Sequence, residues 1–217
     1  WQYIGDDFKK IILPHKKQDI EKAKKAFIKS SDAIPISNIM LGLLYEAEKN
    51  NKKADEFYSK ACDLGVPDGC QYGGILAYKE KNYIKAKENF EKGCDILPSN
   101  CYMLGMLYKD GEGVEQDYSK AKEFFEIACN NLGFNYSCYE IGSLYMNGNG
   151  VKQNYFKAFE IFEKGCQHNN KSSCYDLGNL YFNGYGVRQN TQIAKEYYGK
   201  ACDLGEQKGC DRYKKLK

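Results

Sequence analysis

Ten cysteines are the residues of this sequence whose type and spacing are best suited to chemistry. They fall into five close pairs, seven to nine residues apart: Cys62/Cys70, Cys94/Cys101, Cys129/Cys138, Cys166/Cys174 and Cys202/Cys210. Paired thiols can bind a metal ion, exchange electrons or close a disulfide. Because similar spacings recur five times, we interpret the pairs as five local disulfides. Such bonds persist outside the reducing cytosol, so the sequence predicts a secreted or periplasmic protein.

The other two uses of these thiols fit the sequence less well. Zinc sites normally join close clusters such as C-x2-C, and the sequence has no such cluster and only two histidines, His15 and His168. Redox catalysis needs an attacking cysteine of low pKa, which is usually found in the same C-x2-C motif. We therefore expect no metal ion, no cofactor and no redox activity, and we expect both histidines to lie on the surface near helix ends.

The cysteine pairs belong to a longer repeat. The first cysteine of a pair recurs after 32 to 37 residues, and the segment after the second cysteine returns as CYMLGMLY, CYEIGSLY and CYDLGNLY. Another segment, such as KAKEFFEIAC or KAFEIFEKGC, ends on the first cysteine. Both have apolar residues at positions i, i+3, i+4 and i+7, which predicts two amphipathic helices of about 12 residues in each repeat.

Small residues indicate how the two helices of a repeat meet. The first helix has a glycine three positions before a tyrosine, as in Gly105 and Tyr108, and the second has an alanine such as Ala121. Glycine inside a helix costs about 1 kcal/mol relative to alanine, so its repetition predicts a close approach of the partner helix. The G-x-G-V segment between the helices of the last three repeats follows a helix rather than a strand. We interpret it as a turn with positive φ and not as a nucleotide-binding loop.

These elements, in this order, resemble Sel1-like repeats, and more closely the Helicobacter cysteine-rich branch of that family. The resemblance rests on the LGxLY helix, the GxGV turn, the KA-x-x-x-F/Y helix and the cysteine link, and it covers about residues 18–217. It implies an all-α, right-handed αα superhelix, that is, a solenoid with one disulfide in each link between repeats. The shorter turns near the N-terminus are closer to tetratricopeptide repeats in length.

The predicted organisation is a single repeat domain over residues 1–217. A cysteine-free unit covers about 19–48, and Ser31 and Asn38 stand where later links have cysteines. Five repeats and a capping helix follow, with predicted bounds 36–67, 68–98, 99–135, 136–171, 172–206 and 207–217.

Charge and hydropathy exclude several classes of partner. The net charge is +3, from 32 basic and 29 acidic residues, and only Arg188 and Arg212 are arginines. A phosphate or base reader needs a stronger field and more guanidinium groups, so we expect no nucleic acid partner. No run approaches the roughly 18 apolar residues of a membrane span. The chain begins at Trp1 without a signal-peptide pattern, which we interpret as a mature or trimmed N-terminus, and we expect a monomer.

Function is expected on the side of the first helices, which would line the inner, concave face of a solenoid. Positions +1, +5, +8 and +9 after the second cysteine of each pair form the stripe opposite the core. Tyrosines there add contact area at low entropic cost, and amides can bind a peptide backbone. Packing between helices is the alternative role for the tyrosines. The candidates for a peptide-binding groove are Tyr102, Met106, Tyr139, Ser143, Met146, Asn147, Tyr175, Asn179, Phe182 and Asn183.

An enzymatic function is the alternative. Resemblance to the cysteine-rich branch implies penicillin binding or weak β-lactamase activity. The expected partner is then either a peptidoglycan stem peptide or a host protein. Ser119-Lys120-Ala121-Lys122 matches the S-x-x-K motif of such hydrolases, but no K-T-G element follows. Lys120 and Ala121 are ordinary repeat positions, and Asp117 is a natural N-cap of the same helix. We therefore attribute the match to chance and identify no catalytic residue.

Overall fold

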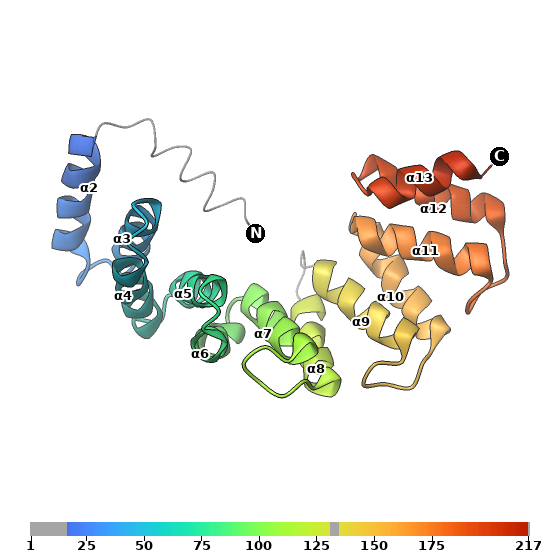
Figure 1. Cartoon of the computed structure of the whole chain (residues 1–217), viewed down its shortest axis with the longest axis horizontal. Helices are drawn as coiled ribbons and strands as arrows, with labels where there is room; N and C mark the ends of the chain where they lie inside the picture. The colour runs from blue at the N-terminus through green and yellow to red at the C-terminus, as the bar shows by residue number, and fades with distance from the viewer. Residues whose placement is uncertain (1–16, 131–134, 217) are drawn as a thin grey trace. The chain divides into compact units, whose positions relative to one another are not determined.

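The computed structural model describes residues 17–130 and 135–216, and within these ranges the chain forms twelve α-helices and no strand (Figure 1). His15 lies outside the described residues. In chain order the helices are α2 (Lys17–Ser30), α3 (Ile36–Ala47), α4 (Asn51–Asp63), α5 (Pro67–Lys79), α6 (Tyr83–Cys94), α7 (Pro98–Asp110), α8 (Tyr118–Asn130), α9 (Asn135–Asn147), α10 (Tyr155–Gln167), α11 (Lys171–Asn183), α12 (Thr191–Asp203) and α13 (Gln207–Lys215). The fold is all-α, as the repeat pattern predicts.

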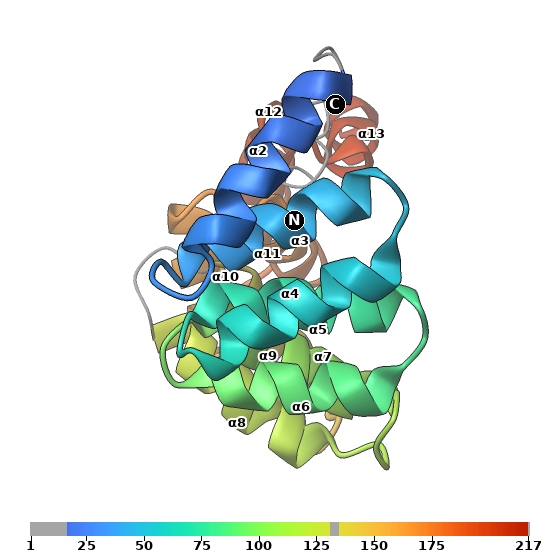
Figure 2. The same ribbon diagram turned by 90° about the vertical axis from the view of Figure 1, so that its left-hand side faces the viewer.

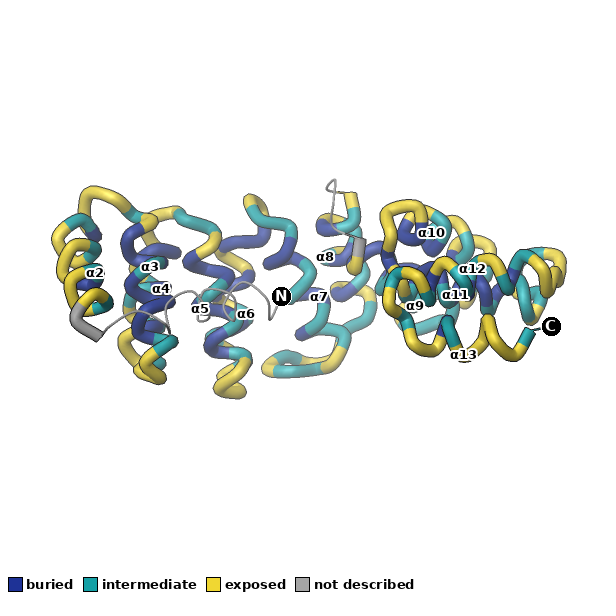
Figure 3. The backbone as a smooth tube through the Cα atoms, turned by 90° about the horizontal axis from the view of Figure 1, so that it is seen from above, coloured by how far each residue is buried: buried dark blue, intermediate teal, exposed yellow. Residues whose placement is uncertain are grey.

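The chain divides into two compact units, residues 1–100 and 101–217. In the first unit α2 packs on α3, α3 on α4, α4 on α5 and α5 on α6 (Figure 2). In the second unit the same neighbour-to-neighbour packing runs from α8 to α13. Each helix thus buries the side that faces its sequence neighbours and exposes the other, as the colouring of Figure 3 shows. A chain held together by neighbour contacts is the defining property of a repeat protein.

A glycine and an aromatic ring form the central contact of every helix pair. A Cβ atom added at Gly142 of α9 would lie 2.4 Å from Cε1 of Phe162 in α10, so only glycine allows the two helices to approach this closely. The ring of Phe162 is fully buried as a result. The equivalent contacts are Gly42/Tyr58, Gly74/Phe90, Gly105/Phe125 and Gly178/Tyr198. The close approach that the repeated glycine predicts is confirmed, and the ring four residues after the repeated alanine is what fills the gap.

The long turns of the second unit take the conformation that their glycines allow. Gly148 and Gly150 have φ values of 77° and 67°, and the corresponding glycines after α7 and α11 are also left-handed. Gln153 then closes the turn, because its Nε2 donates to the carbonyl oxygen of Met146 at 2.9 Å and to the hydroxyl of Tyr155 at 3.0 Å. Gln116 makes both equivalent bonds, to the backbone oxygen of Lys109 and the hydroxyl of Tyr118, whereas Gln189 makes only the bond to a backbone oxygen, that of Phe182. This glutamine is a repeat position that the sequence analysis overlooked.

Disulfides join the links between the helix pairs. The bonded pairs with measured geometry are Cys62–Cys70, Cys129–Cys138, Cys166–Cys174 and Cys202–Cys210, with Cα atoms 4.5 to 4.9 Å apart. Cys94 and Cys101 are disulfide-bonded as well, and none of the ten cysteines is free. Each bond ties the end of one second helix to the start of the next first helix.

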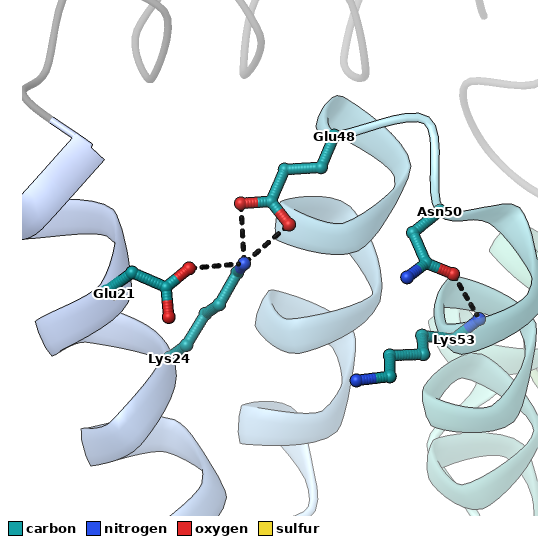
Figure 4. A network of polar contacts seen from close by, with 5 residues as sticks. All are labelled: Glu21, Lys24, Glu48, Asn50 and Lys53. Atoms are coloured by element: carbon teal, nitrogen blue, oxygen red, sulfur yellow. Dashed lines mark hydrogen bonds and ion pairs between the residues drawn. The ribbon is translucent and has the colours of Figure 1, made fainter.

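A polar network joins α2 to the end of α3 at the start of the first unit (Figure 4). The ammonium of Lys24, a residue only 5% exposed, lies 2.5 Å from Glu48 and 3.0 Å from Glu21. Burial lowers the pKa of Lys24, but the bonds to Glu48 and Glu21 outweigh this, and the net shift is upward. Asn50 caps α4 in the same view, accepting from the backbone N–H of Lys53.

Candidate binding surface of the second unit

Helices α7, α9 and α11 carry the predicted groove residues, and we call the surface on which these residues lie the first-helix face. Its members differ in exposure. The two asparagines at the ends of α9 and α11, Asn147 and Asn183, are exposed. The other eight candidates are half-buried: Tyr102, Met106, Tyr139, Ser143, Met146, Tyr175, Asn179 and Phe182.

The three tyrosines of this face pack on the buried rings of their own repeats. The ring centroids of Tyr102 and Phe125 are 5.8 Å apart, those of Tyr139 and Phe162 are 5.7 Å apart, and Tyr175 lies 5.6 Å from Tyr198. Burial raises the pKa of Tyr102 to about 12, with the carboxylate of Glu140 as the next cause. The tyrosines therefore contribute to packing between helices, and their partly exposed edges are what remains for contact with a partner.

The amides of the face are anchored to their own helices. Asn147 Nδ2 donates to Ser143 Oγ at 3.3 Å, and Asn183 Nδ2 donates to the backbone oxygen of Asn179 at 2.8 Å. No bond to the Oδ1 atoms of these two exposed amides is found among the described residues. The C-terminal ends of α9 and α11 thus each present one oriented acceptor, the Oδ1 atom of Asn147 or Asn183. The two acceptors are one repeat apart.

Asp176 is the residue of this face that the sequence analysis missed. It lies on α11, is 7% exposed, and accepts from Nδ2 of Asn179 at 2.9 Å and from the hydroxyl of Tyr139. The hydroxyl of Tyr198 in α12 donates to the other side of the same amide, Asn179 Oδ1, at 2.9 Å. We call Tyr139, Asp176, Asn179 and Tyr198 the Asp176 cluster. It links α9, α11 and α12 through one buried carboxylate.

The electrostatics of the Asp176 cluster follow from burial. Burial raises the pKa of Asp176, and the bonds from Asn179 and Tyr139, together with the charge of Lys208, act in the opposite direction without cancelling it. Burial likewise raises the pKa of Tyr198 to about 12. Perturbed acids of this kind cluster at functional sites, although structural networks also produce them. Acidic residues occupy position +2 in α9 and α11, Glu140 and Asp176, but the same position in α7 holds Met103, so the acid is not a regular feature of the repeat.

Charged side chains flank the cluster along the face. Lys109 of α7 lies 3.0 Å from Glu140 of α9, and both side chains are largely buried. At the other end, the guanidinium of Arg212 in α13 lies 5.9 Å from the ring centroid of Phe182 in α11. The face therefore combines apolar, amide and charged groups of both signs, which suits recognition of a polypeptide better than of a uniformly charged ligand.

Ser119 and Lys122, the two residues of the S-x-x-K match, bind other residues and do not contact each other. Ser119 Oγ donates to the carbonyl oxygen of Gly150 at 3.3 Å, and Lys122 forms an ion pair with Glu126 at 2.7 Å. The bond to Glu126 is the first cause that raises the pKa of Lys122, whereas a general base would need a lowered pKa. Asp117 caps the helix by accepting from the backbone N–H groups of Ser119 and Lys120 at 3.0 Å. These contacts explain the motif as an ordinary helix start.

Two further features of the sequence can be placed. His168 is exposed at the end of α10, and its Nδ1 lies 2.8 Å from the backbone oxygen of Lys164. Over residues 17–130 and 135–216, no group of three or more His, Cys, Asp or Glu side chains could hold a metal ion. The same ranges contain no helix with the length and apolar character needed to cross a membrane.

Helix pairs that repeat in this way, with a disulfide in every link from α4 onward, define an all-α repeat protein of the solenoid class. The model of the Sel1 repeat matches residues 35–66, 69–95, 101–131, 135–170 and 171–206, which is more than half of the chain. The chain therefore belongs to the Sel1 repeat family. Proteins of the Sel1 and tetratricopeptide type are typically scaffolds for protein–protein interaction.

Two solved structures share the fold of this chain, and a third resembles it less closely. A protective antigen of uropathogenic Escherichia coli with an SLR fold has a TM-score of 0.77 and 25% identity, over 88% of this chain and 42% of that chain. The present chain thus spans less than half the length of that relative. A Sel1 repeat protein from Oxalobacter formigenes has a TM-score of 0.70 and 22% identity, over 90% and 92%. Cysteine-rich protein B of Helicobacter pylori is 28% identical over 58% of this chain and 95% of that chain, with a TM-score of 0.47. No curated protein sequence matches.

Proposed function

We propose that the second unit binds an extended peptide segment of a partner protein on its first-helix face, outside the reducing cytosol. The observation that carries the proposal is the Asp176 cluster. A carboxylate that is 7% exposed and carries a raised pKa destabilises the folded state when it is ionised, and apolar residues would pack the same space at lower cost. We therefore assign this acid a role in recognition.

The groups around the cluster support a polypeptide ligand. Asn147 and Asn183 offer carbonyl acceptors for backbone N–H groups, one repeat apart. Near the starts of the same two helices, the partly exposed edges of Tyr139 and Tyr175 supply apolar area with little rotamer entropy to lose. Phe182 adds an apolar contact at the C-terminal end of the face.

The cysteines support the proposed location. Ten of ten are disulfide-bonded, and most of them are buried, so the fold depends on oxidation that a reducing compartment would oppose. A closed loop of about nine residues stabilises by roughly 2 to 3 kcal/mol on the chain-entropy model. Several such contributions are comparable with the whole free energy of unfolding of a typical domain.

A peptide selection tests this function. Peptides displayed on phage are selected against the oxidised full chain, and the dissociation constant of the best one is measured by fluorescence anisotropy. The triple variant Tyr139→Phe/Asn147→Ala/Asn183→Ala is expected to weaken binding tenfold or more, because it removes one hydroxyl and both amides from the face. Lys87→Gln on α6 of the first unit serves as the matched surface control. Equal affinity of the triple variant and the wild type would refute the assignment to this face.

A further inference from the structure

A tyrosine ring covered by a lysine of the same repeat recurs along the chain. The ammonium of Lys53 lies 5.0 Å from the ring centroid of Tyr45. The equivalent distances are 5.3 Å for Lys120 over Tyr108 and 5.1 Å for Lys157 over Tyr145. In each case the tyrosine comes three residues after the helix-pair glycine, and the lysine directly precedes the alanine of the second helix. The chain therefore contains three copies of one cation–π site, each occupied by a lysine of its own repeat, and at Tyr45 the ammonium of Lys24 also lies over the ring, at 4.7 Å.

The last repeat has the ring but not the lysine. Tyr181 occupies the tyrosine position, and Ile193 stands where the other repeats have lysine. Within the described residues, no Lys or Arg side chain lies over the ring of Tyr181. The ring keeps its other neighbours, since it stacks on Tyr197 at 5.7 Å and meets the ring of Phe159 edge-on at 5.6 Å.

A hollow opens at this place. It has a volume of about 430 Å³ and is lined by Tyr181, Ile193, Glu196, Tyr197 and Lys200. The preceding repeat has a hollow of about 310 Å³ at the same repeat position, over Tyr145, and there Lys157 is among the lining residues. The two repeats thus differ at one position of the hollow. Lys157 places an ammonium group over the ring of Tyr145, whereas Ile193 leaves the ring of Tyr181 without one.

The charges around the hollow favour a cation. Glu196 is exposed on its rim, and Glu163 of α10 is near enough to contribute, after burial and Tyr181, to the raised pKa of Tyr197. Lys200 also lines the hollow, but its ammonium donates to the backbone oxygen of Cys166 at 3.0 Å. The hollow is therefore lined by one carboxylate, that of Glu196, and by one ammonium group that is already bonded elsewhere, and the carboxylate of Glu163 acts on its Tyr197 wall from nearby.

We infer that the hollow over Tyr181 binds the side-chain ammonium of a lysine from a partner protein. The ammonium would occupy the place that Lys157 takes over Tyr145, the methylene chain would lie on Ile193, and Glu196 would supply the counter-charge. The three filled copies in the same chain are the template for this occupant. The site lies on α12 and the end of α11 and shares no residue with the Asp176 cluster, so it goes beyond the peptide-binding face proposed above.

The probe for this site is Nα-acetyl-lysine N-methylamide, added to the oxidised full chain with 13C-labelled tyrosine. The Tyr181 ring signals, assigned by their loss in Tyr181→Phe, are expected to shift saturably with a dissociation constant on the order of millimolar. Ile193→Lys should weaken this binding at least tenfold, because it restores the internal ammonium, and Glu196→Gln should weaken it about threefold. Lys157→Ile is the converse variant, and it should create a second site at which the Tyr145 signals shift.

Three results would overturn the inference. The first is that the Tyr181 signals do not respond at probe concentrations far above the millimolar range. The second is an equal response to the Nε-acetylated probe, which carries no charge and would indicate a merely apolar hollow. The third is a Tyr181 shift that depends on protein concentration without any probe, which would mean that another copy of this chain fills the hollow.

Discussion

The side chain of Asn38 donates from Nδ2 to the backbone oxygen of Ser31 at 2.8 Å, across the link between α2 and α3. These two residues occupy the positions of the cysteines in the later links, and Asn38 is fully buried. A hydrogen bond therefore takes the place of a disulfide at the first link. The contact closes the same short loop, but it leaves the unfolded chain unconstrained.

The double substitution Ser31→Cys/Asn38→Cys is expected to install a further disulfide in the first unit. The separation of seven residues equals that of Cys94 and Cys101. Closing a loop of this length should raise the free energy of unfolding by about 2 kcal/mol on the chain-entropy model. Urea unfolding with and without air oxidation measures the gain. The single variant Asn38→Ala should instead lose about 1 to 3 kcal/mol, because it leaves the buried carbonyl of Ser31 without this donor. An oxidised double variant no more stable than the wild type would contradict the equivalence of the two links.

Two adjacent glycines of α5 provide a matched test of helix approach. A Cβ at Gly74 would lie 2.4 Å from Cε1 of Phe90, whereas a Cβ at Gly73 would meet its nearest neighbours, Asn89 and Tyr58, at an ordinary 3.4 Å. Gly74→Ala should therefore destabilise by about 1 to 3 kcal/mol through overpacking. Gly73→Ala should be neutral or stabilise by up to about 1 kcal/mol, through helix propensity. Thermal unfolding of the two variants measures the difference. Similar melting temperatures would show that the glycine–ring contact does not set the distance between the two helices.

The raised pKa of Asp176 predicts a pH dependence of stability. The ionised form is penalised in the folded state, so the folded protein binds more protons than the unfolded chain between the ordinary pKa of 3.8 and the raised value. The free energy of unfolding of the wild type, relative to Asp176→Asn, should therefore fall as the pH rises through this window and stay constant above it. Urea titrations of both proteins from about pH 3 to pH 7 measure the difference. A difference that grows with pH would reverse the sign of the shift and contradict the role of burial.

The disulfides are expected to differ in their resistance to reductants. Cys166 and Cys174 are 2% and 0% exposed, whereas Cys202 and Cys210 are half-buried. Since thiol–disulfide exchange requires a thiolate to reach a sulfur atom, Cys202–Cys210 should be reduced first in the folded protein. Brief treatment with dithiothreitol, alkylation and peptide mass spectrometry would give the order. Equal labelling of both pairs at early times would show that reduction proceeds through global unfolding instead.

The repeat structure was accessible from the sequence because it depends on periodic residues. The glycine of LGxLY, the alanine of the second helix and the cysteines each recur, and a recurring residue marks a recurring contact. Asp176 was not identified because its environment is not periodic: position +2 holds Met103 in α7, Glu140 in α9 and Asp176 in α11. Whether such an acid is buried depends on Tyr139 in the preceding repeat and on Tyr198 in the following helix. A pattern read within one repeat does not contain that information.

The hollow over Tyr181 was missed for a related reason. Recurring residues define a repeat, whereas this site arises where one residue fails to recur, at Ile193. The sequence did contain the signal, because K-A in four second helices becomes I-A in the last. The structure explains this change, because the lysines of the other repeats lie over tyrosine rings.

The buried ring of each helix pair has one more consequence. Three repeats use phenylalanine there and two use tyrosine, with the same contact to glycine in all five. The hydroxyl groups of Tyr58 and Tyr198 extend beyond that contact and donate to Glu46 and Asn179, which belong to the first helices of the same pairs, α3 and α11. Exchange of phenylalanine and tyrosine at this position therefore adds or removes one hydrogen-bond donor for a polar residue of the first helix. The packing of the ring against the glycine stays the same.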